Sequence, residues 1–171
     1  MKIALGIPLN WPYVPVGFFE SIVSMERPTN VESFELIRES YGPLDLMRNN
    51  IVNRAFKANC DKLLMLDADM LYPPDFVDEL VTHNLDIIAP VCYRRYPPFD
   101  ALLYKSVGKG KFKQIDLERE EPSNLIEADR IGTGCILIDM KVFENIKPPW
   151  FKFVRRKNQR TKGEDFYFCD K

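Results

Sequence analysis

The chain has 171 residues, of which 46% are hydrophobic, and its 24 basic and 25 acidic side chains leave a formal net charge of −1. This composition excludes an intrinsically disordered chain, and the balanced charge argues against a nucleic-acid-binding protein, which normally carries a basic excess. No apolar run approaches the ~20 residues that span a bilayer, and Pro8 interrupts the first run too early for a signal peptide. We therefore expect one cytoplasmic domain over residues 1–171, with no membrane span.

In the first half of the chain, short apolar runs alternate with longer amphipathic stretches. The runs predict buried strands, and the stretches predict helices with one apolar face. Strands are expected at 2–7, 33–38, 62–66 and 86–91, and helices at 14–25, from residue 44 onward and after the Pro73-Pro74 pair. This alternation is typical of an α/β layer with a largely parallel sheet.

The second half carries short β-like runs with no helix between them. They are expected at 101–106, 111–117, 125–131 and 135–138. Strands that follow one another in this way favour antiparallel additions to the edge of the sheet. The expected fold class is therefore α/β, with a mixed, mostly parallel central sheet flanked by helices.

The four cysteines are widely spaced and form no CxxC pair, which disfavours both a disulfide framework and a zinc site. We expect them to be buried small hydrophobic side chains in a reducing compartment. They are Cys60, Cys92, Cys135 and Cys169.

The most informative segment is the apolar run that ends in Asp67-Ala68-Asp69. A buried strand here would deliver two carboxylates at its carboxyl end, which is the edge where open α/β sheets bind ligands. Close carboxylates repel each other unless a cation lies beside them, and such hard oxygen ligands suit Mg²⁺ or Mn²⁺. The alternative is that either aspartate satisfies backbone donors in a turn. We favour the metal-binding interpretation.

Two further segments combine glycines with polar residues next to an apolar run. Gly163-Glu164-Asp165 predicts a helix whose first turn presents carboxylates, one of which could act as a general base, although acids also simply favour a helix dipole there. Gly132-Thr133-Gly134 precedes the strand expected at 135–138. Its glycines would let the backbone approach a ligand, or would form a tight turn.

Together these segments resemble the GT-A-type glycosyltransferases that use nucleotide-sugar donors, in particular the large, DxD-containing family-2-like group. The resemblance covers nearly the whole chain and depends on the order and spacing of its parts. Those parts are the first strand and its loop (2–10), the arginine-bearing helix (46–55), the DxD motif (67–69), the GTG-containing segment (131–138 with 142–143), the acceptor-side loop (149–151) and the ED motif (163–165). The resemblance implies a GT-A-like (Rossmann-like) fold, with a nucleotide-binding half of about 1–95 and an acceptor-side half of about 96–171.

The implied activity is metal-dependent transfer of a sugar from a UDP- or GDP-sugar to a hydroxyl of a glycan, lipid or protein acceptor. Asp67 and Asp69 would hold Mn²⁺ or Mg²⁺, with Asp69 the direct ligand, and the cation would neutralise charge on the leaving diphosphate. The other donor-side residues that the resemblance implies are Pro8, Asn10, Arg48, Gly132, Thr133 and Gly134, with Asp67 shared between cation and donor.

On the acceptor side, the resemblance assigns the general base to Asp165, with Glu164 as its rival, in an inverting displacement. In a retaining enzyme, Asp165 would only position the acceptor. The basic segment 147–162, with seven bases and no acid, is either a solvated loop or a lid that closes over the anionic donor. Trp150 and Phe151 within it would stack on a sugar face or anchor the loop to the core. The acidic segment 116–129 is expected to be a solvated loop.

The chain departs from the family pattern at its end. Relatives usually continue beyond the ED helix through another strand, often with a histidine near the metal, whereas this chain stops at Lys171. Its one histidine, His83, is expected on the surface of the helix that follows the DxD motif. The third metal ligand is therefore open, and the chain is either a minimal enzyme or lacks a C-terminal extension.

Three other functions fit parts of the pattern. A nucleotidyltransferase would carry a glycine-rich basic loop after the first strand, where this chain has Pro8-Leu9-Asn10-Trp11-Pro12. A haloacid-dehalogenase-type phosphatase would place its DxD on the first strand with Thr or Val next, whereas Met70 follows the motif here. A sugar- or nucleotide-binding module without turnover remains the alternative outside enzymes.

Overall fold

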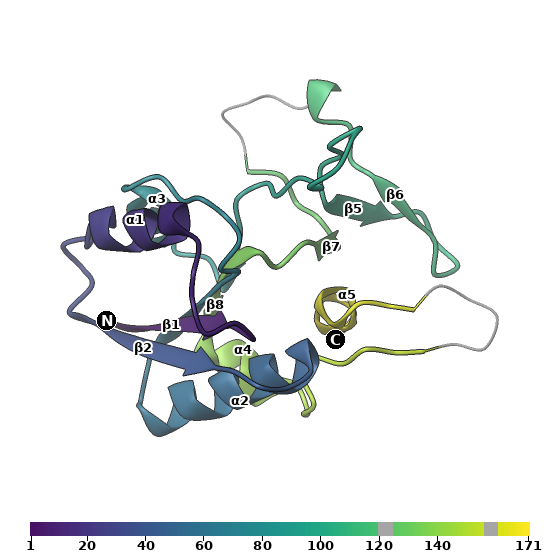
Figure 1. Ribbon diagram of the computed structural model, residues 1–171. Coiled ribbons are helices and arrows are strands. Elements are labelled where there is room, and N and C mark those ends of the chain that lie inside the picture. Colours follow the sequence, from purple (N-terminus) through teal and green to yellow (C-terminus); the bar gives the residue numbers. More distant parts are fainter. Residues whose placement is uncertain (120–124, 156–160) are drawn as a thin grey trace.

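The computed structural model describes residues 1–119, 125–155 and 161–171, and strands alternate with helices through its first half (Figure 1). The elements of that half are β1 (Lys2–Pro8), α1 (Val16–Ser24), β2 (Ser33–Glu39), α2 (Leu44–Lys57), β3 (Lys62–Leu66), α3 (Phe76–Thr82) and β4 (Ile87–Ile88). Those of the second half are β5 (Leu103–Ser106), β6 (Phe112–Gln114), the 3₁₀ helix η1 (Leu117–Arg119), β7 (Arg130–Ile131), β8 (Cys135–Asp139), α4 (Met140–Asn145) and α5 (Glu164–Cys169). The elements expected in the first half are confirmed, although β4 is much shorter than the run at 86–91.

The central sheet is five-stranded and mixed, in the order β2-β1-β3-β8-β4. β1 pairs in parallel with β2 and β3, whereas β8 pairs antiparallel with β3 on one side and β4 on the other. A mixed sheet flanked by helices is thus confirmed, but β8 lies inside the sheet rather than at its edge. Cys135 to Ile138 are all buried, because hydrophobic clusters cover both faces of β8, while β3 and β4 pair with its two edges.

The strands β5, β6 and β7 do not extend the central sheet. They form a separate three-stranded antiparallel sheet in the order β6-β5-β7. The expectation that they join the edge of the main sheet is therefore wrong. Most of their residues are half-buried or exposed, so a small sheet with one covered face satisfies them.

Two hydrophobic clusters cover the two faces of the central sheet. Alternate residues of each buried strand point to opposite faces, so Leu64 and Leu66 pack towards α1 and α3, whereas Leu63 and Met65 pack towards α2 and α4. Figure 1 shows the same arrangement, with α1 and α3 on one face and α2 and α4 on the other. The helix α5 lies between this layer and the second sheet.

The loop before α5 is anchored in the core by two aromatic side chains. The Trp150 indole donates to the carbonyls of Phe143 and Ile146 at 3.0 and 3.1 Å, and Phe151 stacks on Phe168 with 4.9 Å between ring centroids. Both side chains are buried, which confirms the anchoring interpretation of Trp150 and Phe151.

Parts of the two charged segments, 116–129 and 147–162, lie outside the described residues: 120–124 and 156–160. His83 is exposed at the end of α3, as expected. The four cysteines are free; three are buried and Cys169 is half-buried. Within the described ranges, none of the helices combines the length and the apolar character that crossing a bilayer requires.

Candidate functional site

The DxD motif follows β3 and lies beside the Gly-Thr-Gly turn that precedes β8. The backbone N–H of Asp67 donates to the Gly134 carbonyl at 2.8 Å, and the Tyr72 hydroxyl lies 2.9 and 2.8 Å from the carbonyl oxygens of Asp67 and Gly134. A Cβ on Gly134 would lie 2.4 Å from the Met70 sulfur and 3.6 Å from Asp67 Oδ2. A side chain at position 134 would therefore displace Met70, and glycine lets the turn approach the motif without that shift.

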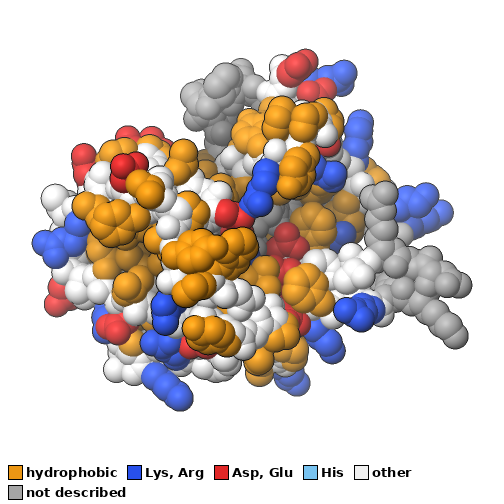
Figure 2. Space-filling view, in the orientation of Figure 1, with side chains coloured by type: hydrophobic (Ala, Val, Ile, Leu, Met, Phe, Trp, Pro, Cys, Tyr) orange, Lys and Arg blue, Asp and Glu red, His pale blue; other side chains and the backbone are white. Residues whose placement is uncertain are grey.

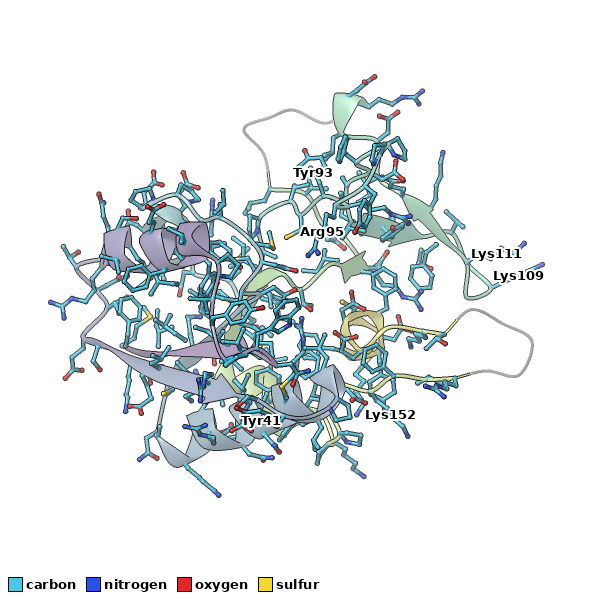
Figure 3. All side chains as sticks on the ribbon, viewed as in Figure 1. Tyr41, Tyr93, Arg95, Lys109, Lys111 and Lys152 are labelled. Atoms are coloured by element: carbon cyan, nitrogen blue, oxygen red, sulfur yellow. The ribbon has the colours of Figure 1, made fainter. Side chains whose placement is uncertain are left out.

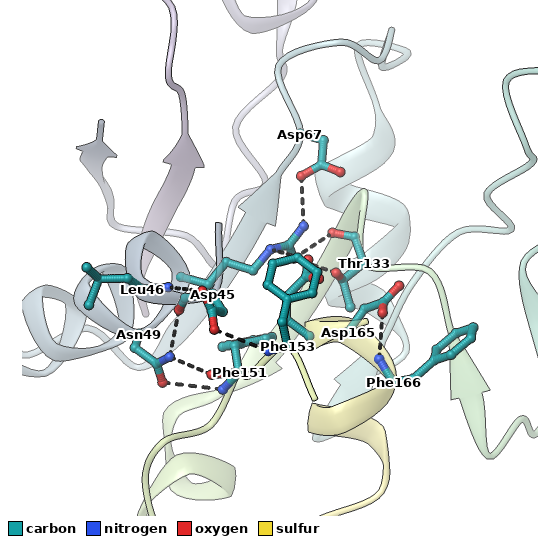
Figure 4. A network of polar contacts seen from close by, with 11 residues as sticks. Asp45, Leu46, Asn49, Asp67, Thr133, Phe151, Phe153, Asp165 and Phe166 are labelled. Carbon is teal, nitrogen blue, oxygen red and sulfur yellow. Dashed lines mark hydrogen bonds and ion pairs between the residues drawn. The ribbon is translucent and has the colours of Figure 1, made fainter. Parts of the chain in front are cut away.

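The buried guanidinium of Arg48 joins three of the segments that the sequence singled out. Its Nη2 donates to Asp67 Oδ1 at 2.9 Å, its Nη1 donates to the carbonyl and hydroxyl oxygens of Thr133, and its Nε lies 3.5 Å from Glu164 Oε1. Figure 4 draws part of this network. Arg48 points inward because it shares the buried face of α2 with Ile51 and Val52, three and four residues on.

The next residue of α2, Asn49, holds the loop that contains Trp150 and Phe151. Its amide donates to the Phe151 carbonyl at 2.7 Å, and its Oδ1 accepts from the Trp150 N–H at 2.8 Å. One turn earlier, Asp45 accepts from the Phe153 N–H at 3.2 Å (Figure 4). A single helix thus fixes the DxD motif, the Gly-Thr-Gly turn, the ED motif and this loop. Sequence reasoning missed Asn49, because nothing local distinguishes it from any polar helix residue.

The ED motif opens α5, where Glu164 and Asp165 lie in the first turn. Glu164 is buried against Arg48, whereas Asp165 is half-buried and its Oδ1 accepts from the Phe166 N–H at 2.7 Å (Figure 4). A Cβ on Gly163 would lie 2.4 Å from Asp165 Oδ1, so the carboxylate needs glycine there to fold back over the helix start. Asp165 is thus the more accessible acid of the motif.

Burial shapes the electrostatics of this cluster. It raises the pKa values of Asp67, Glu164 and Asp165, the positive charge of Arg48 opposes the rise in each, and the neighbouring carboxylates add to it for Asp67 and Glu164. Asp69 and its partner Arg95 lie next to this cluster. The site then holds four carboxylates and two guanidinium groups, a formal charge of about −2; they are those of Asp67, Asp69, Glu164 and Asp165 and those of Arg48 and Arg95. One divalent cation would neutralise it.

A cavity of about 430 Å³ opens in front of the DxD motif, within the range of small-molecule sites. It is lined by predicted residues together with several that sequence reasoning missed. The predicted residues are Pro8, Asn10, Asp67 and Asp69, and the others are Leu9, Trp11, Tyr13, Pro15, Leu44, Met47, Ala68 and Arg95. On the face in Figure 2, acidic side chains lie in a hollow bordered by hydrophobic ones.

The remaining predicted residues lie behind this cavity. Arg48 and Thr133 are each 2% exposed; Arg48 reaches Asp67 from the core side, and Thr133 accepts from Arg48. Of the two glycines of the turn, Gly134 accepts from the Asp67 N–H, whereas Gly132 donates to the Leu102 carbonyl. The side chain of Asn10 pairs with the backbone of Gly42 at 3.0 and 3.2 Å, so it braces the cavity wall. Glu164 and Asp165 are not among the lining residues.

Sequence reasoning also missed Arg95, although the direction of the strand before it indicates the edge of the sheet at which it lies. It follows β4, which runs in the same direction as β3 because both pair antiparallel with β8. The carboxyl ends of such strands meet at one edge, so the segment that follows β4 is expected near the DxD motif, but Arg95 lies seven residues beyond Ile88 and the folded loop brings its side chain to Asp69. Trp11 and Tyr13 carry no comparable signal.

The carboxylates of the DxD motif fit a cation that brings further ligands with it. Among the described residues, neither Asp67 Oδ2 nor Asp69 Oδ1 accepts a hydrogen bond, so each aspartate offers one oxygen. The described part of the chain brings together no group of three His, Cys, Asp or Glu side chains that could hold a metal. Mg²⁺ is commonly bound by one or two carboxylates plus substrate phosphates and water, which matches this donor set.

A larger cavity, of about 750 Å³, lies on the other side of β8. Its walls are mainly apolar and include Ile88, Ile136 and Phe168, and none of the predicted site residues lines it. Size alone therefore does not identify the site; the clustered carboxylates do.

No family model matches the chain, and no curated protein matches it either. Among solved structures, A197 from STIV matches with 16% sequence identity and a TM-score of 0.62, over 99% of this chain and 77% of that one. A 4-diphosphocytidyl-2C-methyl-D-erythritol synthase matches with 13% identity and a TM-score of 0.42, over 85% of this chain and 80% of that one. At these identities the likeness to A197 concerns the fold alone: the chain shares a mixed α/β architecture with it along nearly its full length.

Proposed function

We propose that this protein is a metal-dependent glycosyltransferase of GT-A-like, Rossmann-like fold, which moves a sugar from a UDP- or GDP-sugar to an acceptor hydroxyl with inversion. The observation that carries the proposal is the junction at Arg48, which ties Asp67, Thr133 and Glu164 together beside a cavity that contains both DxD carboxylates. A reducing, cytoplasmic location belongs to the same proposal, supported by the four free cysteines.

On the donor side, the nucleotide would occupy the cavity in front of β3. Asp67 and Asp69 would hold Mn²⁺ or Mg²⁺, and the bound cation would stabilise the negative charge of the departing nucleoside diphosphate. Arg48 supports this role by fixing Asp67 through Oδ1, which leaves Oδ2 available. Trp11 and Tyr13, in edge-to-face contact with 5.9 Å between centroids, supply an apolar wall for the base.

On the acceptor side, Asp165 is the better candidate for the general base. Glu164 is buried and engaged with Arg48, whereas Asp165 is only half-buried, and its Oδ2 accepts no hydrogen bond from any described residue. Burial raises the pKa of Asp165, which strengthens its carboxylate as a base. In the proposed reaction, that carboxylate takes the acceptor's hydroxyl proton while the oxygen attacks the sugar.

Calorimetric titration of UDP and GDP, with Mn²⁺ and again with EDTA, tests the donor site first. We expect binding that requires the cation and favours one base. Asp69→Asn should lose the cation-dependent binding and keep the fold, whereas Asp165→Asn should bind normally and lose transfer. Asp78→Asn, an exposed acid in the first turn of α3, is the matched control and should change neither property.

Three outcomes would refute the proposal in different ways. Cation-dependent nucleotide binding with neither sugar transfer nor donor hydrolysis would establish a binding module without turnover. Failure of well-folded protein to bind either nucleotide would exclude the donor site. Transfer of a nucleotidyl group from a nucleoside triphosphate, with release of pyrophosphate, would instead identify a nucleotidyltransferase.

A further inference from the structure

The two carboxylates of the DxD motif each pair with one arginine, but in opposite environments. Arg48, which pairs with Asp67, is buried and has further partners in Thr133 and Glu164. The side chains of Arg95 and Asp69 are 64% and 54% exposed, and Asp69 is the one partner of Arg95 among the described residues. The first pair is therefore a fixed part of the core, whereas the second can open into solvent at little cost.

The loop that carries Arg95 is held at its base and leaves the side chain free. Tyr93 forms a β-bridge with Ala101, and the backbone N–H of Arg94 donates to the Asp100 carbonyl at 2.9 Å. Figure 3 shows Arg95 directed towards the middle of the molecule, unlike Lys109 and Lys111, which project outward from a hairpin tip. The long side chain of Arg95 can therefore move within the cavity while its backbone stays in place.

We propose that Arg95 is an exchangeable counter-ion of the donor site. Without a cation, its guanidinium neutralises Asp69. When a divalent cation and a diphosphate enter together, the guanidinium leaves Asp69 and binds the diphosphate oxygens. The inference rests on the proposed function, because it takes Asp69 as a cation ligand and a diphosphate as the anion.

Charge and geometry support this exchange. A guanidinium and a divalent cation compete for the carboxylate of Asp69. The formal charge of about −2 already includes Arg95, so a bound divalent cation would bring the site to about zero, and an entering diphosphate would supply the negative charge that the displaced guanidinium then pairs with. Arg95 and Asp69 line the same cavity, so the displaced guanidinium stays beside the entering ligand. A planar guanidinium binds phosphate oxygens in a bidentate manner, which makes the diphosphate a better partner than one exposed carboxylate.

Removing Arg95 should therefore shift two affinities in opposite directions. Mn²⁺ alone should bind Arg95→Ala about 2–5-fold more tightly, because an exposed ion pair no longer competes for Asp69. Pyrophosphate, titrated at saturating Mn²⁺, should bind about 10–100-fold more weakly, because a charge-assisted contact is lost. Arg95→Lys should lie between Arg95→Ala and the unmodified protein in both titrations.

Electron paramagnetic resonance of free Mn²⁺ and calorimetry with pyrophosphate measure the two affinities without any sugar donor. Arg94→Ala is the matched control: the same loop carries Arg94, which lies 3.9 Å from Asp100 and does not line the cavity. A local loss of structure in Arg95→Ala would weaken both ligands together, so shifts of opposite sign distinguish the exchange from a structural effect.

The inference is overturned if Arg95→Ala binds pyrophosphate as tightly as the unmodified protein, or binds Mn²⁺ no more tightly. Its failure is distinguishable from that of the proposed function. Opposite shifts in a protein that transfers no sugar would refute the glycosyltransferase and leave the exchange intact. Normal sugar transfer by Arg95→Ala, without the opposite shifts in affinity, would refute the exchange and leave the glycosyltransferase intact.

Discussion

Arg48→Met is the substitution that tests the central junction most directly. Methionine retains an unbranched side chain of similar reach and removes the charge, so Glu164, only 8% exposed, and Asp67 would lose their shared cation. Removing one partner of a buried ion pair costs about 3–5 kcal/mol, because the other charge stays buried and uncompensated. For a chain of this length, that corresponds to a fall in Tm of about 6–20 °C.

The deficit should depend on pH. In the folded protein, burial already raises the pKa values of Asp67 and Glu164 against the opposing effect of Arg48, and without Arg48 both rise further. An acid with a raised folded pKa binds its proton more tightly in the folded state, so stability is gained as pH falls. Urea unfolding should therefore show a smaller difference between Arg48→Met and the unmodified protein at pH 5 than at pH 7.

Two further variants complete the test. Adding Glu164→Gln to Arg48→Met removes the buried charge and should restore part of the lost stability. Arg54→Met, on the exposed side of the same helix and paired with Glu39 at 2.8 Å, should cost less than about 1 kcal/mol. A deficit for Arg48→Met below about 1 kcal/mol, or one that is equal at both pH values, would refute the assignment of Arg48 as the buried counter-ion.

Three other substitutions test the framework around the site. Burial alone would raise the pKa of Asp170, but hydrogen bonds from Arg130 and Lys162 outweigh this effect, and the pKa is lowered from its ordinary value. Urea unfolding at pH 7 should therefore show a loss of about 1–2 kcal/mol in the stability of Asp170→Asn. That deficit should fade as the pH drops through the lowered pKa, and an equal deficit at pH 3 would contradict the assignment. Phe151→Ala should cost about 3–5 kcal/mol by thermal unfolding, because the ring is 1% exposed, and a loss below about 1 kcal/mol would show that the loop is not anchored there. Gly6→Ala should cost about 1–3 kcal/mol, because its Cβ would lie 2.5 Å from Ile51 Cγ2. Ile51→Ala removes that Cγ2 and should cost less in the Gly6→Ala background than in the unmodified protein; an equal cost in both backgrounds would place the strain elsewhere.

The candidate site was only partly predictable from the sequence. The position of Asp67 and Asp69 could be predicted, because a buried apolar strand ends just before the motif and this pattern is local in the sequence. The resemblance places Arg48 near the nucleotide, which stays a prediction; the structure adds that Arg48 is buried behind Asp67, because residue 48 falls on the buried face of α2. Arg95 reaches Asp69 across 26 positions of the chain, and only the folded loop brings the two together.

The elements of the first half can be located from the sequence alone, because each is encoded by local periodicity. β1 and β3 are continuous apolar runs, and α2 carries its buried residues at helical spacing. Which strands become neighbours is seen only in the folded molecule. β8 pairs between β3 and β4, and the strands β5 to β7 form a sheet of their own. An apolar run states that a strand is buried, but its partners and their direction depend on contacts between residues far apart in the chain, which no local pattern contains.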